Sequence, residues 1–363
     1  MGLASGTNSL QTAVVNTTLG KSKLSLLLCS VGVLACEVGY AITSKFDPSV
    51  PSPRSYIDRI VMDHRQQHAS AGTNNDDDND SEPKKIAIIT GANSGIGYET
   101  AKAVGRAGFH TILACRNPEL AKEAVEKLER QTGLEGRFEY VHLDLASLKS
   151  VKEFVEEFKS RGRALDLLIN NAGVMACPYS QTADGLEMQF GTNHVGHFAL
   201  TTGLLDELKK APAARVVVVS SMGSFMVNEI SYEAIEQRDK YSRTDNYAIS
   251  KLANITFAAT LARKLQGTSV KVNALHPGSV VTQLYRHIGT NRILHTIESA
   301  ILMDEVAGSV TSTYVALSPE VENDSGEFFS RMLKMKMPPN ATNIEEQDKL
   351  WEYTETLISQ KMK

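Results

Sequence analysis

The chain has 363 residues, 42% of them hydrophobic and 22% charged, as in an ordinary globular protein with one large or two modest domains. The formal net charge is −4 at pH 7, so the chain lacks the excess of basic residues that binds nucleic acid, and nucleic acid is not an expected partner. The four cysteines form no C-x-x-C pair and the nine histidines form no HExxH motif, which argues against a disulfide framework and against a zinc site.

The first apolar segment, residues 24–42, has about the length that crosses a bilayer as a helix, roughly 20 residues. A cleaved signal peptide is the alternative, although the polar stretch before the segment is long for one. We therefore expect the N-terminal region 1–63 to contain a transmembrane helix and the membrane to be a partner. The flanking cations slightly favour a cytoplasmic main domain, and the expected location is the endoplasmic reticulum membrane; these cations are Lys21 and Lys23 before the segment, and Lys45, Arg54 and Arg59 after it.

Residues 64–83 are predicted to form an acidic, disordered linker. Their last part, NNDDDNDSEP at 74–83, is too polar and too uniformly charged to bury a core. The aspartates imitate the start of an EF-hand loop, but Ser81 replaces its glycine and Ala87 its final glutamate, so calcium binding is not expected.

From residue 84 onward, short apolar runs alternate with stretches of helical length. This alternation predicts a parallel sheet covered by helices on both faces, that is, one doubly wound α/β domain of Rossmann type over residues 84–363. A ligand is expected at the carboxyl ends of the strands. The predicted strands are 85–90, 110–115, 138–143, 165–170, 215–220 and 269–275.

A glycine-rich loop, TGANSGIG at 90–97, follows the first predicted strand and opens the first helix. Gly91, Gly95 and Gly97 allow a tight turn and the close approach of a pyrophosphate, while the helix N-terminus offers free N–H groups. The strand–turn–helix context favours dinucleotide binding over an ordinary loop. Asn93, Ser94 and Ile96 belong to the same predicted cofactor-binding loop.

The second strand ends in ACRN, where an NAD-type site would place an acidic residue to hold the ribose hydroxyls. Arg116 stands there instead, and a guanidinium suits the additional phosphate of NADP. The alternative is a surface arginine without a ligand. The position relative to the glycine loop favours NADP(H) as cofactor, with Arg116 and Asn117 beside it.

The stretch YAISK at 247–251 places Tyr247 and Lys251 four residues apart, on one face of a helix. A nearby cation favours the phenolate and lowers the phenol's pKa, so the pair can transfer a proton. Taken alone, such a pair is more often an ordinary helix face.

Taken together, motifs in a fixed order resemble the short-chain dehydrogenase/reductase family. They are TGANSGIG, Asp144 in HLDLAS, NNAG at 170–173, Asn193 in GTNHVGHF, VVSS at 218–221, the Tyr247–Lys251 pair and HPGSVVT at 276–282. The sequences of the motifs ACRN and NNAGVM are similar to those of the branch that holds the retinol dehydrogenases. The resemblance implies a seven-stranded parallel sheet and a hydride transfer with a nicotinamide cofactor.

The resemblance also assigns roles to individual residues. Tyr247 would donate or accept the proton, Lys251 would hold the cofactor ribose, Ser221 would bind the reacting oxygen, and Asn193 would support a proton-relaying water. Ser220 would close its strand. The remaining cofactor contacts would come from Asp144, Leu145, Asn171, Ala172, Gly173, Pro277, Gly278, Val280 and Thr282.

These features predict a membrane-anchored oxidoreductase that transfers a hydride between NADP(H) and a lipophilic alcohol or carbonyl, such as a retinoid, steroid or polyprenoid. The stretches 222–246 and 279–303 are apolar enough to line such a substrate pocket. The alternative is a catalytically silent NADPH-binding scaffold, because 25 residues separate Ser221 from Tyr247. A homodimer is possible, and the C-terminal helix is expected either to pack on the domain or to lie on a membrane.

Overall fold

The computed structural model describes residues 51–70, 85–278 and 304–362. The predicted membrane segment at 24–42 and the acidic stretch at 74–83 lie outside these ranges. Among the described residues, no helix is both long enough and apolar enough to cross a bilayer.

The described residues form an eight-stranded sheet in the order β3-β2-β1-β4-β5-β6-β7-β8. The strands from β1 to β7 pair in parallel, and the order runs outward from β1 in both directions. This confirms the predicted doubly wound α/β fold and places the switch point between β1 and β4. The strands are β1 (Ile86–Thr90), β2 (His110–Cys115), β3 (Phe138–His142), β4 (Leu167–Asn170), β5 (Arg215–Val219), β6 (Lys271–His276), β7 (Phe328–Ser330) and β8 (Leu333–Met335).

The seven parallel strands match the predicted sheet, and the structure adds an eighth strand that the sequence did not predict. β8 pairs antiparallel with β7 through a tight hairpin. Its two connecting residues, Arg331 and Met332, both have positive φ, 51° and 63°, as a two-residue type I′ turn requires. Each of these strands has only three residues, which is too short to give a pattern in the sequence.

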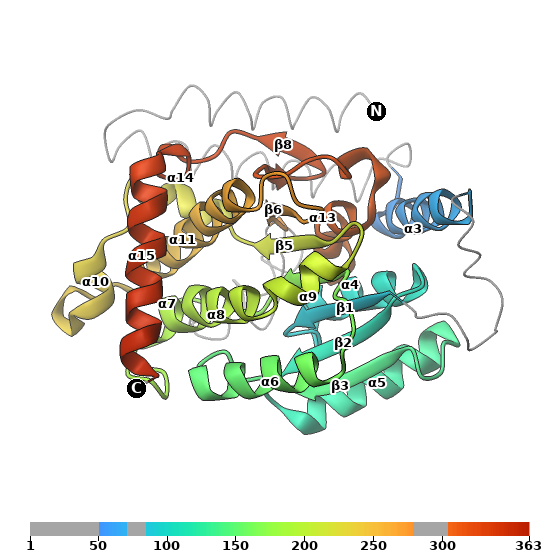
Figure 1. The fold of residues 1–363 in the computed structure, drawn as a ribbon, viewed down its shortest axis with the longest axis horizontal. Coiled ribbons are helices and arrows are strands. Elements are labelled where there is room, and N and C mark those ends of the chain that lie inside the picture. Colours follow the sequence, from blue (N-terminus) through green and yellow to red (C-terminus); the bar gives the residue numbers. More distant parts are fainter. Residues whose placement is uncertain (1–50, 71–84, 279–303, 363) are drawn as a thin grey trace, which may run out of the picture.

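Helices cover both faces of the sheet, as Figure 1 shows. Successive strand residues point to opposite faces, so Ile88 lies in one apolar core and Ile89 in the other. The first core packs against α6, α8, α11 and α15, and the second against α3, α4, α5 and α13. These helices are α3 (Pro53–Ser70), α4 (Gly95–Arg106), α5 (Pro118–Thr132), α6 (Leu148–Ser160), α8 (Gly196–Gly203), α11 (Arg243–Lys264), α13 (Glu305–Leu317) and α15 (Ile344–Lys361).

Short elements complete the described fold. They are α7 (Met188–Phe190), the π-helix η1 (Gly191–Val195), α9 (Leu205–Lys210), η2 (Met222–Met226), α10 (Tyr232–Glu236), η3 (Arg238–Lys240), η5 (Pro319–Val321) and α14 (Pro339–Thr342). Three of them, η2, α10 and η3, occupy the stretch 222–246 between Ser221 and Tyr247. That stretch is therefore largely structured.

Helix α3 corrects the predicted boundary of the linker, because residues 64–70 are its last turns. Ile57, Ile60 and Val61 are buried against α4 and α13, and so is His64, whose Nδ1 lies 3.0 Å from the carbonyl of Leu317. These four buried positions follow the i, i+3, i+4, i+7 spacing of an amphipathic helix.

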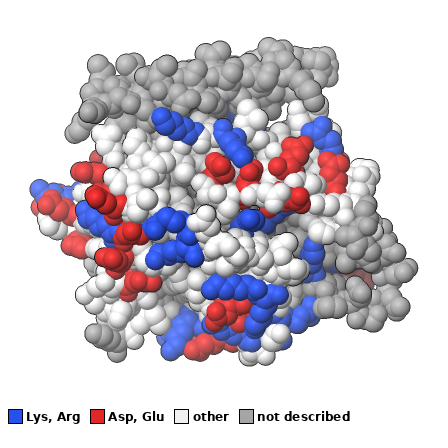
Figure 2. All heavy atoms as spheres, turned by 45° about the horizontal axis from the view of Figure 1, so that its top comes forward, with Lys and Arg blue, Asp and Glu red and all other residues white. Residues whose placement is uncertain are grey.

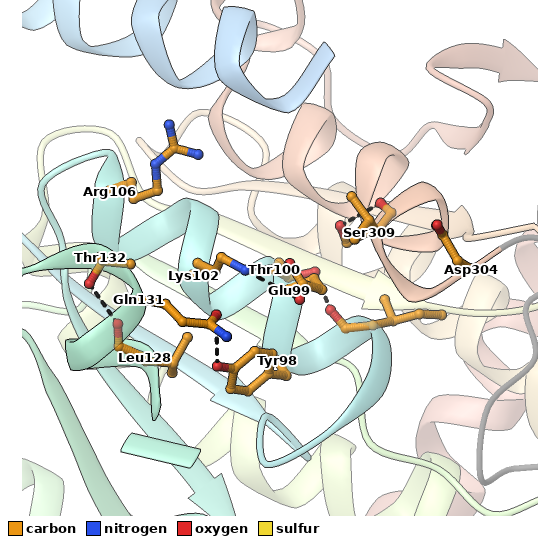
Figure 3. Close-up of polar contacts among 12 residues, drawn as sticks. Tyr98, Glu99, Thr100, Lys102, Arg106, Leu128, Gln131, Thr132, Asp304 and Ser309 are labelled. Carbon is orange, nitrogen blue, oxygen red and sulfur yellow. Dashed lines mark hydrogen bonds and ion pairs between the residues drawn. The ribbon is translucent and has the colours of Figure 1, made fainter. Parts of the chain in front are cut away.

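An ion pair also links α3 to α4. Asp58 of α3 lies 2.8 Å from Arg106, the last residue of α4, whose side chain points toward α3 in Figure 3. Helix α3 is therefore part of the folded domain, although it lies in the predicted N-terminal region.

At the other end of the chain, α15 packs on the domain. Leu350 and Trp351 belong to the first core, and the Trp351 ring lies 4.7 Å from that of Phe198 and 6.0 Å from that of Phe257. Of the two expected roles of this helix, the structure shows packing.

Charge is mixed on the surface. Figure 2 shows basic and acidic side chains interspersed over the face it presents. On α6 they form pairs one turn apart, such as Lys149–Glu153 and Lys152–Glu156. Exposed pairs of this kind add little stability.

Candidate active site

The glycine-rich loop connects β1 to α4 at the carboxyl edge of the sheet. Gly91 and Gly95 have φ of +64° and +60°, which side chains other than glycine rarely adopt. A Cβ at Gly97 would lie 2.5 Å from both the Asn171 amide nitrogen and the Gly91 carbonyl oxygen. The backbone is therefore packed too closely here for any other residue.

Helix α4 begins directly after this loop, at Gly95. Its N-cap, Ser94, makes no side-chain capping hydrogen bond, so the first N–H groups of the helix face the loop without that partner. Further along, the Tyr98 hydroxyl donates to Gln131 of α5 at 3.2 Å and the Thr100 hydroxyl to the Ile96 carbonyl at 2.7 Å (Figure 3). The helix is thus held against α5 while its N-terminus is left for a phosphate.

A cleft of about 470 Å³ opens over the glycine loop. It has room for a dinucleotide-sized ligand, and its lining comes from the carboxyl ends of β1, β2, β4, β5 and β6. Most of the residues predicted from the sequence meet there: Gly91, Asn93, Ser94, Gly95, Ile96, Gly97, Arg116, Asn117, Asp144, Leu145, Asn171, Ala172, Gly173, Ser221, Tyr247, Lys251, Pro277 and Gly278. Val280 and Thr282 lie outside the described residues.

At the tip of β2, Arg116 is exposed and lines the cleft. Asn117 caps α5, because its side chain accepts a hydrogen bond from the N–H of Leu120 at 2.9 Å. Asp144 accepts from the N–H of Ala146 at 2.9 Å. Asn117 and Asp144 therefore have structural roles as well as a place in the cleft, whereas Arg116 extends into solvent.

Asn171 ties the end of β4 to the end of β1. Its side-chain nitrogen donates to the Thr90 carbonyl at 2.8 Å, and the Thr90 hydroxyl accepts from the N–H of Ala172 at 2.9 Å. The same hydroxyl lies 2.9 Å from Nε2 of His197, a buried residue of α8. Thr90 and His197 support this edge of the cleft. The sequence predicted no role for either residue.

Lys251 is the buried cation of the site. Its side chain is 4% exposed, and its Nζ donates to the Val219 carbonyl at 3.1 Å and lies 5.8 Å from the ring centre of Tyr247. Burial lowers the pKa of Lys251 to about 8, because the charged form loses hydration. A positive charge at this place stabilises negative charge that develops on a nearby oxygen during proton transfer.

The two adjacent serines have different positions. The Ser220 hydroxyl is buried and donates to the Lys251 carbonyl at 2.6 Å, so it joins the end of β5 to α11. The Ser221 hydroxyl accepts from the N–H of Gly223 at 3.1 Å and lines the cleft. A Cβ at Gly223 would lie 3.4 Å from both the Ser221 hydroxyl and the Tyr247 ring, so these two side chains are neighbours.

Asn193 lies behind the cleft, in the π-helix η1. Its fully buried side chain accepts from the N–H of Val174 at 2.8 Å and donates to the Val174 carbonyl and the Ser250 hydroxyl, both at 2.9 Å. Single π-helical turns inside helices often occur at functional sites. Here the turn brings Asn193 close to both Gly173 and α11; its predicted support of a water stays a prediction.

This arrangement fits a nicotinamide cofactor and acid–base chemistry. The glycine loop and the N-terminus of α4 would hold its phosphates, and Lys251 and the loop after β4 would face its ribose and ring. A bound nicotinamide supplies or accepts the hydride. Tyr247, beside the Ser221 hydroxyl and the Lys251 cation, is placed to hold or release a proton at its phenolic oxygen.

Known proteins agree with this architecture. A family model described as short chain dehydrogenase matches residues 85–292. Retinol dehydrogenase 14 of Mus musculus is 42% identical over 287 residues, covering 76% of this chain and 86% of its own length. Retinol dehydrogenase 13 of Homo sapiens is 41% identical over 284 residues (76% and 85%), and the short-chain dehydrogenase TIC 32 A of Brassica napus is 38% identical over 303 residues (80% and 94%).

Solved structures share the fold. An uncharacterized protein from Mycobacterium paratuberculosis superposes with a TM-score of 0.61 at 33% identity, covering 76% of this chain and 93% of its own. A short chain dehydrogenase from Escherichia coli, solved with NADPH, has a TM-score of 0.53 at 23% identity and covers 68% and 95%. With its glycine loop, its tyrosine–lysine pair and these relatives, the chain belongs to the short-chain dehydrogenase family, in the branch of the retinol dehydrogenases.

Proposed function

We propose that this protein is a membrane-anchored, NADP(H)-dependent oxidoreductase acting on a lipophilic alcohol or carbonyl, with Tyr247 as proton donor or acceptor. Membership of the family makes the chain an oxidoreductase whose fold binds a nicotinamide cofactor. The finer points, the choice of cofactor, the substrate and the membrane, are argued below.

The observation that carries the proposal is that Ser221, Tyr247 and Lys251 are neighbours and line the same cleft. It favours turnover over the alternative of a silent NADPH-binding scaffold. The long stretch between Ser221 and Tyr247 folds into short helices and leaves the two side chains adjacent. A scaffold without turnover could use Lys251 to hold the cofactor ribose, but it would have no need for a phenol and a serine hydroxyl side by side next to that lysine.

The preference for NADP(H) rests on Arg116. It is exposed at the tip of β2, on the cofactor side of the cleft, where it can pair with a phosphate on the adenosine ribose. Such a charge-assisted pair contributes about 1.5–3 kcal/mol, or about ten- to a hundredfold in affinity. Arg116→Asp should therefore lose NADPH affinity by that factor while NADH affinity stays or rises; unchanged NADPH binding would contradict this role.

The proposal that the substrate is lipophilic is based on apolar residues in the wall of the cleft. Val174, Met175 and Met188 line it, and methionine side chains adapt to irregular apolar ligands. The relatives named retinol dehydrogenase imply, by that name, a lipophilic alcohol as their substrate. We propose the same chemical class here, with retinoids, steroids and polyprenoids as candidates.

The proposed attachment to the endoplasmic reticulum membrane, with the catalytic domain in the cytoplasm, rests on residues 24–42. Their apolar length and flanking cations support it. Alkaline carbonate washing should leave the full-length chain in the membrane pellet, and a variant without residues 1–50 should be released from it. Recovery of the full-length chain in the supernatant would refute the anchor.

One experiment tests the function as a whole. Purified full-length protein in detergent is assayed with NADPH and NADH against a panel of retinoid, steroid, polyprenoid and aliphatic carbonyls. We expect NADPH-dependent reduction of at least one lipophilic carbonyl. Tight NADPH binding by calorimetry without turnover of any member of the panel would favour the scaffold instead.

A further inference from the structure

Gln189 is a buried amide at a junction of three segments, and the reaction described above gives it no role. It is fully buried in α7, directly before the π-helix that carries Asn193. Its Oε1 accepts from the N–H of Ala176 at 2.7 Å. Its Nε2 donates to the Tyr241 hydroxyl and to the Arg243 carbonyl, both at 3.0 Å. One side chain thus satisfies three groups from two distant parts of the chain.

The first of these parts is the loop after β4, which forms a wall of the cleft. Val174 and Met175 line the cleft, and Val174 is fixed by both hydrogen-bonding atoms of the Asn193 side chain. The next residue but one, Ala176, has φ of +49°, a conformation that residues other than glycine adopt rarely and at a cost. Its hydrogen bond to Gln189 holds the loop in that conformation.

The second part is the stretch 222–246, at the point where it enters α11. The Tyr241 hydroxyl donates to the Cys177 carbonyl at 2.6 Å, so Tyr241 and Gln189 are both hydrogen-bonded to the loop after β4. A few residues later, the Asn246 side chain donates to the Ala234 carbonyl of α10 at 2.7 Å, and Tyr247 follows directly. The segment that leads to the catalytic tyrosine is therefore bound to the loop that lines the cleft.

We propose that Gln189, Tyr241 and the backbone of Ala176 and Cys177 form a clamp that positions the substrate-facing wall, Val174–Met175, against Tyr247. The clamp residues do not touch the reacting atoms, so Gln189 and Tyr241 are positioning residues. The inference rests on the proposed function, since it concerns the carbonyl end of a substrate that extends along this wall. A substrate too short to reach the wall would depend on the clamp much less.

The test compares Gln189→Met and Tyr241→Phe, singly and together, with the wild type. Methionine keeps the length and volume of glutamine but cannot bond Ala176, Tyr241 or Arg243. Phenylalanine keeps the ring of Tyr241, which packs edge-on against Tyr179 at 5.3 Å, and removes only its hydroxyl. Tyr179→Phe is the matched control, because it removes a hydroxyl from the same aromatic pair outside the clamp.

The full-length proteins are assayed with NADPH and two probes, decanal and propanal. For Gln189→Met we expect kcat/KM for decanal to fall by about ten- to a hundredfold, as small misplacements of reacting groups do, and that for propanal by much less. Tyr241→Phe should show the same selectivity with a smaller loss, and the double variant should fall short of the product of the two. Affinity for NADPH should stay within about twofold, since the cofactor-facing residues of the loop after β4, Asn171 and Ala172, are held by Thr90 and not by the clamp.

A second readout does not need turnover. Amide hydrogen exchange at Ala176 should speed up in Gln189→Met and stay at the wild-type rate in Tyr179→Phe, because only the former removes its acceptor. Wild-type kcat/KM for decanal in both Gln189→Met and Tyr241→Phe would overturn the proposal. Equal losses for both probes together with weaker NADPH binding would also overturn it, since they would indicate a merely structural role. A wild type that reduces no lipophilic carbonyl would instead contradict the proposed function.

Discussion

Replacing Lys251 by methionine tests whether burial of the charged lysine in the active site lowers the free energy of unfolding. The side chain is 4% exposed, and burial lowers its pKa from 10.5 to about 8. That difference corresponds to about 3 kcal/mol by which the folded, cofactor-free protein disfavours the charged lysine relative to the unfolded chain. At pH 7 the lysine is nevertheless charged, so the folded state bears nearly this whole cost.

The sign of the pH dependence follows from the two pKa values. Between about pH 8 and pH 10.5 the folded protein has released the proton of Lys251 while the unfolded chain still binds it. Stability therefore rises with pH through this window, because the unfolded state holds more protons there. Lys251→Met lacks this contribution. From pH 7 to pH 9.5, the unfolding free energy of the wild type should gain about 2 kcal/mol relative to the variant.

Urea denaturation of the cofactor-free proteins at several pH values between 7 and 9.5 measures this difference. Lys149→Met serves as the control, because the Lys149 side chain is 84% exposed and its charge stays in water in both states. We expect a constant difference between wild type and control across the range. A difference between wild type and Lys251→Met that is also constant with pH would refute the reasoning, since it would show that burial does not shift the titration of Lys251.

Further changes test the other parts of the site and the fold. Tyr247→Phe keeps the ring and its packing, so NADPH binding should survive while turnover falls by about 10²–10⁴; turnover at the wild-type rate would exclude Tyr247 as the proton donor. Gly97→Ala places a methyl group 2.5 Å from the Asn171 amide and the Gly91 carbonyl, so cofactor affinity by calorimetry should fall by about tenfold or more. Deleting residues 1–70 removes α3 and exposes its contacts on α4 and α13, where each buried Ile or Val stabilises by about 1.5–3 kcal/mol. The melting temperature should drop by more than about 5 °C relative to a deletion of 1–50, and equal melting temperatures would show that α3 adds no stability.

The sheet and the cleft could be predicted from the sequence because their signals are local. Buried parallel strands are apolar throughout, and the observed β1, β2 and β5 begin and end within one residue of the predicted runs. The glycine loop is recognisable because only glycine permits its backbone. The choice of Ser221 over Ser220 came from the family resemblance, and the structure agrees with it: the Ser220 hydroxyl is buried against the Lys251 carbonyl, while Ser221 lines the cleft.

Other features could not be read from the sequence because their causes lie far away along the chain. Nothing around Gln189 distinguishes a buried glutamine from an exposed one; its partners are 13, 52 and 54 residues away. The strands β7 and β8 are too short to show a pattern. Helix α3 did leave a signal, the spacing of Ile57, Ile60, Val61 and His64, but the polar residues of its last turns and the acidic run after them made residues 64–83 resemble a linker.

The two ends of the described chain bear on how the protein would sit at a membrane. Helix α15 buries Leu350 and Trp351 in the core, and its Thr354 hydroxyl lies 3.0 Å from Nε2 of His194, in the π-helix beside Asn193. Its Tyr353 hydroxyl donates to Glu236 of α10 at 3.0 Å. Helix α15 therefore supports both the π-helix and the stretch 222–246, and the proposed membrane attachment rests on residues 24–42 alone.

In the proposed membrane attachment, helix α3 would determine how far the catalytic domain can stand from the bilayer. It follows the proposed membrane segment in the chain and precedes the acidic stretch, and it is docked on α4 and α13 through four buried side chains and the Asp58–Arg106 pair. In the proposed arrangement, the domain is joined to the membrane by residues 43–52, which can span at most about 35 Å. The acidic stretch lies within the chain between two parts of the same folded domain, so its length does not set that distance. A cleft held this close to the bilayer suits a substrate that stays dissolved in lipid.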